Sequence, residues 1–318
     1  MKKVVMTVED RGIDYSPIID YLAENQLMAE WRPLKEQTSA ELLQIVQDAD
    51  AVIAGVERWD AGTMNKVSPR LKVIARYGIG YDSVDVKAAR RLGITVTNTP
   101  VVLSEAVAEL VLGLYIDLNR TISKQDAKLH QGNWGHPNMG HNIAEKTVGL
   151  VGFGAIGQRF AELLAPFHCR ILAYDPFFDI NAGKRIGVEQ VSMEILLKES
   201  DCISLHLPVT AETKGLVNDR FLDKMKKSAF LINTSRGALV EEEALVNALA
   251  SGVIAGAALD VYANEPLPSE NMLKGLPNLI MTPHIGSATE ESFLKAGLLA
   301  AENVRDVLGG KKPKYSVS

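Results

Sequence analysis

Short apolar runs rich in β-branched residues alternate with helical segments along most of this chain, in two series. The first series covers about 100 residues, and its candidate strands are KVVMTV at 3–8, ADAVIAG at 49–55, LKVIARYG at 71–78 and ITVTNT at 94–99. Apolar runs separated by segments long enough for a crossover helix are typical of a parallel sheet. We therefore expect a first parallel sheet of four or five strands.

A long helical segment at about 104–130 interrupts the alternation. Its apolar residues recur at helical spacing from Val107 through Leu118. Beyond a loop rich in Gly, Asn and His at 131–142, the alternation restarts. Six further candidate strands follow: TVGLVGF, RILAYD, DCISLHLP, AFLINTS, AGAALDV and NLIMTPH. They predict a second doubly wound sheet, and the long helix is expected to be a domain connector or a dimer arm.

The small size of the first sheet indicates that its domain is completed by a later part of the chain. A chain of 318 residues exceeds one typical domain. A last helical segment at about 290–308 follows the second series, and we expect it to return to pack on the first sheet. The predicted fold class is α/β, with two doubly wound, Rossmann-like domains. Residues 101–286 would be inserted into a domain made of 1–100 and 287–318.

Charge and hydropathy argue against several classes of protein. The formal net charge is -5 without a block of Lys and Arg, so we expect neither a nucleic-acid partner nor an anionic membrane partner. No window approaches about 18 uninterrupted apolar residues. The N-terminal MKKVVMTVED is typical of a first strand rather than of a signal segment. A cytoplasmic location is therefore the expectation.

The two cysteines, Cys169 and Cys202, lie far apart in the sequence and in apolar surroundings. They can form neither a disulfide framework nor a CxxC metal site. We therefore expect both to be reduced residues of the core, and we expect no metal site in this protein.

A glycine-rich loop marks the start of the second series. VGLVGFGAIGQRF places Gly152, Gly154 and Gly157 in G-x-G-x-x-G spacing, between an apolar strand and a helix. The first glycine allows a tight turn, the second allows a pyrophosphate to approach the backbone, and the third allows close packing. The N–H groups at the helix start, around Ala155 and Ile156, would meet the anion. A purely structural tight turn is the alternative.

An acidic residue follows at the distance that dinucleotide binding requires. The next strand, RILAYD, ends in Asp175, where a carboxylate can accept both hydroxyls of an adenine ribose. The same carboxylate would repel a 2′-phosphate, and no arginine follows before Arg185, so NAD is favoured over NADP. Alternatively, Asp175 only caps a turn before Pro176.

A hydride transferred to a carbonyl leaves an alkoxide, which a positioned acid must protonate, and histidine is the natural candidate. His284 follows the last strand of the second series, at the sheet edge where ligands bind in doubly wound folds. The other five histidines have simpler explanations. Four of them lie in loops or links, and His206 lies at a strand end near the cofactor: His130, His136, His141, His168 and His206.

Two charged residues would complete a site around His284. Glu265, in DVYANEPLP, is placed to orient the imidazole, although such a residue can also be an ordinary loop carboxylate. Arg236 follows the apolar strand AFLIN, and an arginine fork matches the carboxylate of a 2-oxo or 2-hydroxy acid. An ordinary surface or capping arginine is the alternative.

With these residues identified, the chain resembles the D-isomer-specific 2-hydroxyacid dehydrogenase family over essentially its whole length. The motifs that carry the resemblance occur in order: VGFGAIGQRF, YDP, LHLPVTAETKGLVN, LINTSRGALVEEEAL, GAALDVYANEP and NLIMTPHIGSAT. The resemblance implies that Arg236 holds the substrate carboxylate and polarises the carbonyl. It also implies that His284 is the acid/base and that Glu265 pairs with it.

The resemblance implies further roles that the chemistry alone does not. Asp260 would bond the nicotinamide amide, and Pro208 and Thr234 would line the cofactor. In the loop YGIGYDSVD, the N–H groups of Ile79 and Gly80 would reach the substrate carboxylate. The family is usually dimeric, and the apolar connector helix agrees with a homodimer.

Within the family, Arg76 before the GIG loop and the YDP strand are most similar to the phosphoglycerate dehydrogenase and hydroxypyruvate-glyoxylate reductase branch. Leu103 stands where the family commonly has a polar residue near the pocket. The regulatory domain of longer phosphoglycerate dehydrogenases is not expected in this chain. Arg58 and Arg76 could bind a phosphate. Phosphoglycerate, hydroxypyruvate, glyoxylate and a branched 2-oxo acid all stay open as substrates.

The predicted function is NAD-dependent hydride transfer at C2 of a D-2-hydroxy acid or 2-oxo acid, with two domains closing around the reactants. The main alternative is an NADH-sensing, corepressor-like protein without turnover. A formate or phosphonate dehydrogenase of the same fold is a third interpretation.

Overall fold

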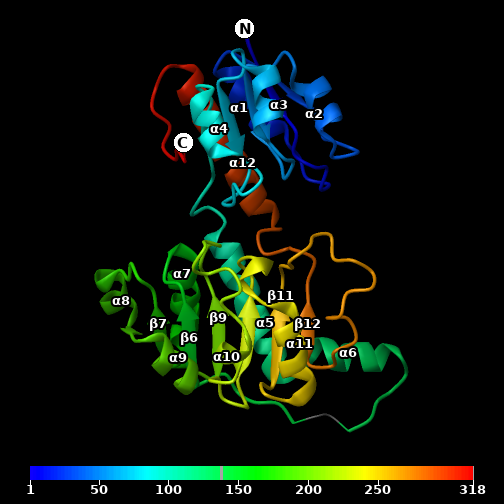
Figure 1. Ribbon diagram of the computed structural model, residues 1–318, viewed down its shortest axis with the longest axis vertical. Coiled ribbons are helices and arrows are strands. Elements are labelled where there is room, and N and C mark those ends of the chain that lie inside the picture. Colours follow the sequence, from blue (N-terminus) through cyan, green and yellow to red (C-terminus); the bar gives the residue numbers. More distant parts are fainter. Residues whose placement is uncertain (137–138, 318) are drawn as a thin grey trace. The chain divides into compact units, whose positions relative to one another are not determined.

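The computed structural model describes residues 1–136 and 139–317. The chain divides into two compact units (Figure 1). The first consists of Met1–Leu103 with Ser287–Ser318, and the second of Ser104–Gly286. The predicted ranges differ from these units only at residues 101–103, which belong to the first unit. The second unit is thus an insertion in the first.

The first unit is built on a five-stranded parallel sheet with the order β2-β1-β3-β4-β5. Its strands are β1 Lys2–Met6, β2 Leu27–Trp31, β3 Ala51–Ala54, β4 Val73–Arg76 and β5 Thr95–Thr97. Three of them lie within the predicted runs, and β1 begins one residue before its run. The fifth, β2, is an edge strand in which only Leu27 is buried, and its sequence lacks a continuous apolar run.

Helices cover both faces of this sheet, as a parallel sheet requires. They are α1 Ser16–Glu24, α2 Ser39–Val46, α3 Ala61–Val67, α4 Val86–Arg91 and α12 Glu290–Leu308. Helix α12 packs against α1, β3 and β4, so its predicted return to the first sheet is confirmed (Figure 1). Gly297 makes the approach possible, because a Cβ there would lie 2.0 Å from Cδ1 of Ile18.

The second unit contains a seven-stranded parallel sheet with the order β12-β11-β10-β9-β6-β7-β8. Its strands are β6 Thr147–Val151, β7 Arg170–Tyr174, β8 Val188–Gln190, β9 Cys202–Leu205, β10 Phe230–Asn233, β11 Gly256–Leu259 and β12 Leu279–Met281. The six predicted strands are all present, and β8 is an additional edge strand. The order reverses between β6 and β9, and ligands bind at such a reversal, beyond the carboxyl ends of the strands.

The helices of the second unit flank this sheet (Figure 1). In chain order they are α5 Ser104–Arg120, α6 Ile122–His130, α7 Ala155–Leu164, η1 Ala165–Phe167, α8 Ile180–Ile186, α9 Met193–Glu199, α10 Asp219–Leu222, η2 Gly237–Leu239 and α11 Glu242–Ser251. The predicted single helix over 104–130 is wrong. The structure has α5 Ser104–Arg120 and α6 Ile122–His130, separated at Thr121, whose φ of 53° is left-handed. The carboxylate of Asp117 accepts the Ser123 N–H and stabilises this turn.

Helix α5 packs on α7, β10 and β11, whereas the structure buries no residue of α6. Cys169 and Cys202 are both free thiols, the first half-buried and the second buried. Within 1–136 and 139–317, no group of three or more His, Cys, Asp or Glu side chains could hold a metal ion. No helix among these residues has both the length and the apolar character needed to cross a bilayer.

Candidate active site

The glycine loop follows β6, at the reversal of the strand order. Gly152 has a φ of 101°, and a Cβ on it would lie 2.4 Å from the carbonyl oxygen of His206. A Cβ on Gly157 would lie 2.6 Å from the carbonyl oxygen of Gly152. By contrast, a Cβ on Gly154, the N-cap of α7, would meet nothing within 4 Å. The outer glycines therefore serve the turn and the packing, and the middle one faces open space that suits a pyrophosphate.

Asp175 follows β7, and its carboxylate is held by the backbone. One oxygen accepts the N–H of Phe153 and the other the N–H of Phe177, each at 2.7 Å. The side chain thus caps the turn before Phe177 and ties the glycine loop to β7. Because a carboxylate oxygen has two lone pairs, each oxygen can still accept a ribose hydroxyl.

The other predicted cofactor residues follow strands at the same edge of the sheet. Ala155 and Ile156 form the first turn of α7, Pro208 lies three residues after β9, and Thr234 directly follows β10. Thr234 is 9% exposed, and its hydroxyl has no hydrogen-bond partner among the residues that the structure describes. An unpaired buried hydroxyl at this edge is chemically suited to a polar cofactor.

His206 lies beneath the glycine loop and is unsuited to acid catalysis. Burial lowers the pKa of His206 to about 3, so the ring is neutral at physiological pH. The centroid of its ring lies 6.0 Å from that of Phe160 on α7. The histidine therefore packs under the loop, which agrees with its prediction as a strand-end residue.

Arg236 lies two residues beyond Thr234, where the chain leaves β10 and enters η2. The Nδ2 group of Asn233 donates to the Arg236 carbonyl at 2.9 Å, and Nη1 of Arg236 donates to the Ser235 carbonyl at 2.6 Å. A Cβ on Gly237 would lie 1.8 Å from the carbonyl carbon of Tyr262. This contact packs the segment of Arg236 against the loop that carries Glu265.

His284 and Glu265 form a hydrogen-bonded pair. Nδ1 of His284 lies 2.6 Å from Oε2 of Glu265, and Oε1 of Glu265 accepts the N–H of Tyr262 at 2.9 Å. The side chains are 51% and 34% exposed. Because Nδ1 is engaged by the carboxylate, Nε2 is the ring nitrogen that can exchange a proton with a ligand.

Opposing effects act on the carboxyl group of Glu265. Burial alone would raise its pKa, but the hydrogen bonds from His284 and from the Tyr262 amide lower it. The charges of His284 and Arg236 act in the same direction, so the pKa of Glu265 is below its ordinary value. The carboxylate of Glu265 orients the ring of His284 through their hydrogen bond.

Asp260 fixes the backbone around His284, a role that the sequence did not indicate. Its side chain is completely buried, and its Oδ1 accepts the Thr282 hydroxyl at 2.6 Å and the Ile285 N–H at 2.8 Å. Oδ2 accepts the Gly286 N–H at 2.8 Å, and the Asp260 carbonyl accepts the His284 N–H at 2.9 Å. These bonds stabilise the left-handed φ of 52° at His284. A contact from Asp260 to the nicotinamide stays a prediction.

Comparisons with known proteins agree with this site. The family model for the D-isomer specific 2-hydroxyacid dehydrogenase, NAD binding domain, matches residues 112–286, more than half of the chain. A glyoxylate reductase from Thermococcus litoralis is 41% identical over 296 residues, which cover 91% of this chain and 89% of that protein. The chain belongs to the D-isomer specific 2-hydroxyacid dehydrogenase family.

Further relatives of the dehydrogenase support the same conclusion. A D-3-phosphoglycerate dehydrogenase from Synechocystis is 38% identical over 282 residues, 88% of this chain but 51% of that protein. The solved structure of the TT0316 protein from Thermus thermophilus has a TM-score of 0.90 at 40% identity and covers 99% of this chain and 100% of that chain. D-lactate dehydrogenase from Escherichia coli has a TM-score of 0.85 at 29% identity, with 100% of both chains covered.

The dehydrogenase is thus an NAD-dependent enzyme that interconverts 2-hydroxy acids and 2-oxo acids. None of these relatives supports the alternative of an NADH-sensing protein without turnover. The second unit brings together Arg236, Glu265 and His284, and the glycine loop lies at the same edge of its sheet. Ile79 and Gly80 follow β4 in the first unit.

The phosphate-binding role considered for Arg76 finds no support. The residue is 7% exposed, and two of its nitrogens donate to backbone carbonyls, Nε to Gly80 at 3.0 Å and Nη1 to Ala54 at 2.7 Å. Arg58 is exposed, so its possible contact with a phosphate stays a prediction.

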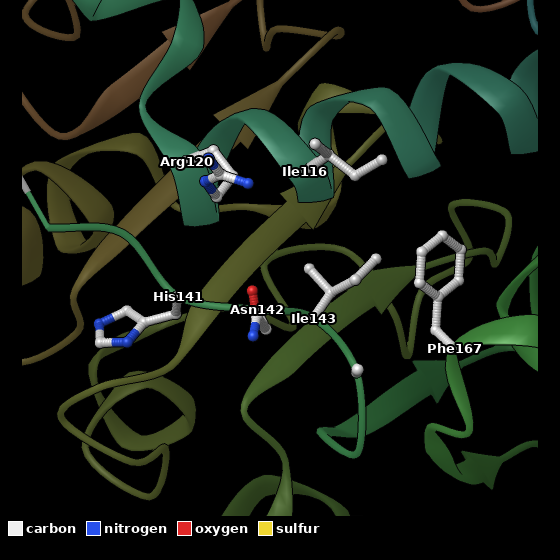
Figure 2. A pocket seen from close by; sticks show the side chains of 7 residues that line it. Ile116, Arg120, His141, Asn142, Ile143 and Phe167 are labelled. Atoms are coloured by element: carbon white, nitrogen blue, oxygen red, sulfur yellow. The ribbon is translucent and has the colours of Figure 1, made fainter.

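A surface hollow of about 220 Å³ in the second unit lies away from this chemistry (Figure 2). Its lining residues are Ile116, Arg120, His141, Asn142, Ile143, Ala144 and Phe167. Residues 141–144 precede β6, and Phe167 precedes β7. The hollow therefore lies at the amino-terminal edge of the parallel sheet, opposite the edge that carries the candidate active site.

Proposed function

We propose that this dehydrogenase reduces a small, unphosphorylated 2-oxo acid of the glyoxylate or hydroxypyruvate type to the D-2-hydroxy acid, with NADH as the reductant. The observation that carries the proposal is the pair of His284 and Glu265 at 2.6 Å, with the charge of Arg236 acting on the same carboxylate. The Thermococcus litoralis relative, matched over 89% of its length, is a glyoxylate reductase. The burial of Arg76 argues against one candidate phosphate ligand and supports an unphosphorylated substrate.

Each side chain of the site has a distinct role in this proposal. The guanidinium of Arg236 binds the substrate carboxylate and polarises the carbonyl. Nε2 of His284 donates the proton to the oxygen on C2, and Glu265 stabilises the imidazolium before this transfer. The bound nicotinamide supplies the hydride. In the first unit, the N–H groups of Ile79 and Gly80 bind the substrate carboxylate.

The cofactor is held by the loop and by the residues that follow the strands. Gly152, Gly154 and Gly157 shape the loop, and the amides of Ala155 and Ile156 bind the pyrophosphate. Asp175 accepts the adenine ribose hydroxyls, and Pro208, Thr234 and Asp260 line the nicotinamide side. Asp175→Ala should narrow the preference for NADH over NADPH, and the ratio of kcat/KM for the two cofactors measures this preference. An unchanged ratio would remove Asp175 from cofactor selection.

The experiment that tests the proposal is an NADH-oxidation panel. The substrates are glyoxylate, hydroxypyruvate, phosphohydroxypyruvate, 2-oxoisocaproate and pyruvate. We expect the highest kcat/KM for glyoxylate or hydroxypyruvate. A preference for phosphohydroxypyruvate or 2-oxoisocaproate would contradict the proposed substrate class, and NADH binding without turnover of any acid would contradict the reaction.

A homodimer and a cytoplasmic location are part of the proposal. Helix α6 has no buried residue, and its apolar side chains Ile122 and Leu129 are each 54% exposed. Trp134, just beyond this helix, is 85% exposed. An interface that covers this segment would remove apolar surface from water. The mass in solution tests it, because a monomer at micromolar concentration would contradict the dimer.

A further inference from the structure

The loop after β4 turns its carbonyl groups toward the body of the first unit. The carbonyl of Gly78 accepts the N–H of Thr99 at 2.9 Å, and the carbonyl of Ile79 accepts Nδ2 of Asn98 at 2.8 Å. Asn98 is 7% exposed and follows β5, the strand beside β4. The loop is therefore attached to the end of the neighbouring strand through two successive carbonyls.

Arg76 holds the third carbonyl in succession. Its Nε donates to the carbonyl of Gly80 at 3.0 Å, and its Nη1 donates to the carbonyl of Ala54, at the end of β3, at 2.7 Å. A Cβ added to Gly78 would lie 3.7 Å from Nη2 of Arg76, so the guanidinium lies directly beneath the loop. The planar fork of arginine can make two such bonds at once, which lysine cannot.

The N–H groups of the same loop show the opposite pattern. Across residues 1–136 and 139–317, neither the N–H of Ile79 nor that of Gly80 donates a hydrogen bond. Backbone N–H groups without a partner are satisfied by water or by a ligand. With three carbonyls fixed on one side, these donors are held ready for an acceptor, and a carboxylate is a strong acceptor of such bonds.

We propose that Arg76 and Asn98 are positioning residues for substrate binding. They hold the loop carbonyls and thereby keep the N–H groups of Ile79 and Gly80 available to the carboxylate of the 2-oxo acid, which neither side chain touches. This inference rests on the proposed function, because it takes those two amides as carboxylate binders. Every 2-oxo acid carries the carboxylate, so the two residues act equally on phosphorylated and unphosphorylated substrates.

The test compares KM with kcat for Arg76→Met and Asn98→Ala. The substrates are glyoxylate, hydroxypyruvate and phosphohydroxypyruvate. Loss of a charged donor should raise KM about 10- to 100-fold in Arg76→Met, and loss of a neutral donor about 3- to 10-fold in Asn98→Ala. The factor should be the same for all three acids, and kcat should change less than about threefold, because binding is lost equally in the ground and transition states. Arg76→Lys should give an intermediate KM.

Asn25→Ala is the matched control. Nδ2 of Asn25 also donates to a backbone carbonyl of the first unit, that of Tyr21, at 2.8 Å. Asn25 precedes β2, which is the outer strand on the other side of the sheet from β5, the strand that Asn98 follows. This variant should lose similar thermal stability, but its KM should equal that of the wild type. NADH titration by fluorescence should give the same Kd for all of these variants.

Three results would overturn the inference. A rise in KM confined to phosphohydroxypyruvate would make Arg76 a phosphate ligand. An unchanged KM in Asn98→Ala would show that substrate binding does not depend on the hydrogen bond from Asn98 to the loop carbonyl. If Arg76→Met does not fold, the KM of Asn98→Ala alone tests the inference. A fall in kcat at constant KM would place the residues in the chemical step. A wild-type enzyme that reduced none of the acids would instead overturn the proposed function together with this inference.

Discussion

The two units present their functional groups by opposite arrangements. In the second unit, the buried carboxylate of Asp260 accepts hydrogen bonds from backbone N–H groups and so presents a side chain, that of His284. In the first unit, the side chains of Arg76 and Asn98 donate to the carbonyls of Gly80 and Ile79, whose own N–H groups make no hydrogen bond among the described residues. A hydrogen-bond acceptor, Asp260, therefore positions the proposed proton donor, and hydrogen-bond donors, Arg76 and Asn98, position the proposed carboxylate site.

This difference follows from what each site must do. Proton exchange near neutral pH requires a titratable side chain, whereas binding a carboxylate requires only fixed donors. We therefore expect changes around His284 in the second unit to lower kcat, and changes around the loop of the first unit to raise KM.

Replacement of the proposed acid should have the largest effect. His284→Asn should lower kcat about 10²- to 10⁴-fold, because no group then protonates the oxygen on C2. Steady-state kinetics with glyoxylate measure this change, and the Kd for NADH serves as the control because it should not change. A variant that kept full activity would remove His284 from the chemistry and would end the proposed division of roles.

Gly237→Ala should disturb the contact between the Arg236 segment and the Glu265 loop. A Cβ 1.8 Å from the Tyr262 carbonyl carbon forces two backbone segments apart. Overpacking of this kind costs about 1–3 kcal/mol of stability, and we expect a fall in kcat/KM of about tenfold or more. Urea unfolding measures the loss of stability, and steady-state kinetics measure the fall in kcat/KM.

Gly113→Ala is the control, since a Cβ on this glycine of helix α5 meets nothing within 4 Å. Equal kinetics in the two variants would contradict the role of this contact.

Asp260→Asn should show whether the buried acceptor positions His284. The amide has one acceptor oxygen, so one of the N–H groups of Ile285 and Gly286 would face an NH₂ group. We expect a loss of about 1–3 kcal/mol of stability and a fall in kcat of roughly tenfold. Thermal unfolding and the kcat for glyoxylate measure these effects. If stability fell while kcat did not, Asp260 would be structural only.

The smallest expected effect is a pH-dependent contribution of Glu265 to stability. Its pKa is lowered in the folded state, so its stabilising contribution is present above the unfolded pKa, about 4.3, and is lost as the pH falls through the folded pKa. Because the side chain is 34% exposed, the contribution should be below about 1 kcal/mol. The difference in free energy of unfolding between wild type and Glu265→Gln should shrink from pH 7 to pH 3. A constant difference would contradict this ionisation.

Buried strands were predicted from the sequence, whereas partly exposed strands were missed. The strands at the centre of both sheets have buried, continuous apolar runs, and all of them were predicted. The two strands that were missed, β2 and β8, lie at sheet edges and are partly exposed, so their sequences lack that pattern. The break at Thr121 was missed because the apolar spacing ends at Leu118, before the left-handed residue.

The candidate active-site residues could be chosen from the sequence because each follows an apolar strand that the sequence shows plainly. Parallel strands bring their carboxyl ends to one edge, so Arg236, Glu265 and His284 were expected to meet within the second unit. The anchoring role of Asp260 had no such signal, since its partners lie 22 to 26 residues further along the chain. Arg76 was considered as a phosphate ligand because a sequence does not show how deeply an arginine is buried.

The order of the amino acids was sufficient for the α/β class, the inserted domain, the glycine loop and the choice of candidate catalytic side chains. These features depend on periodicity and spacing, which are local. Folding was needed to establish that Asp260 and Arg76 face inward, one accepting from amides and the other donating to carbonyls. Hydrogen-bond partners of buried charges come from separate strands and loops, and only the folded chain brings those groups within about 3 Å of one another.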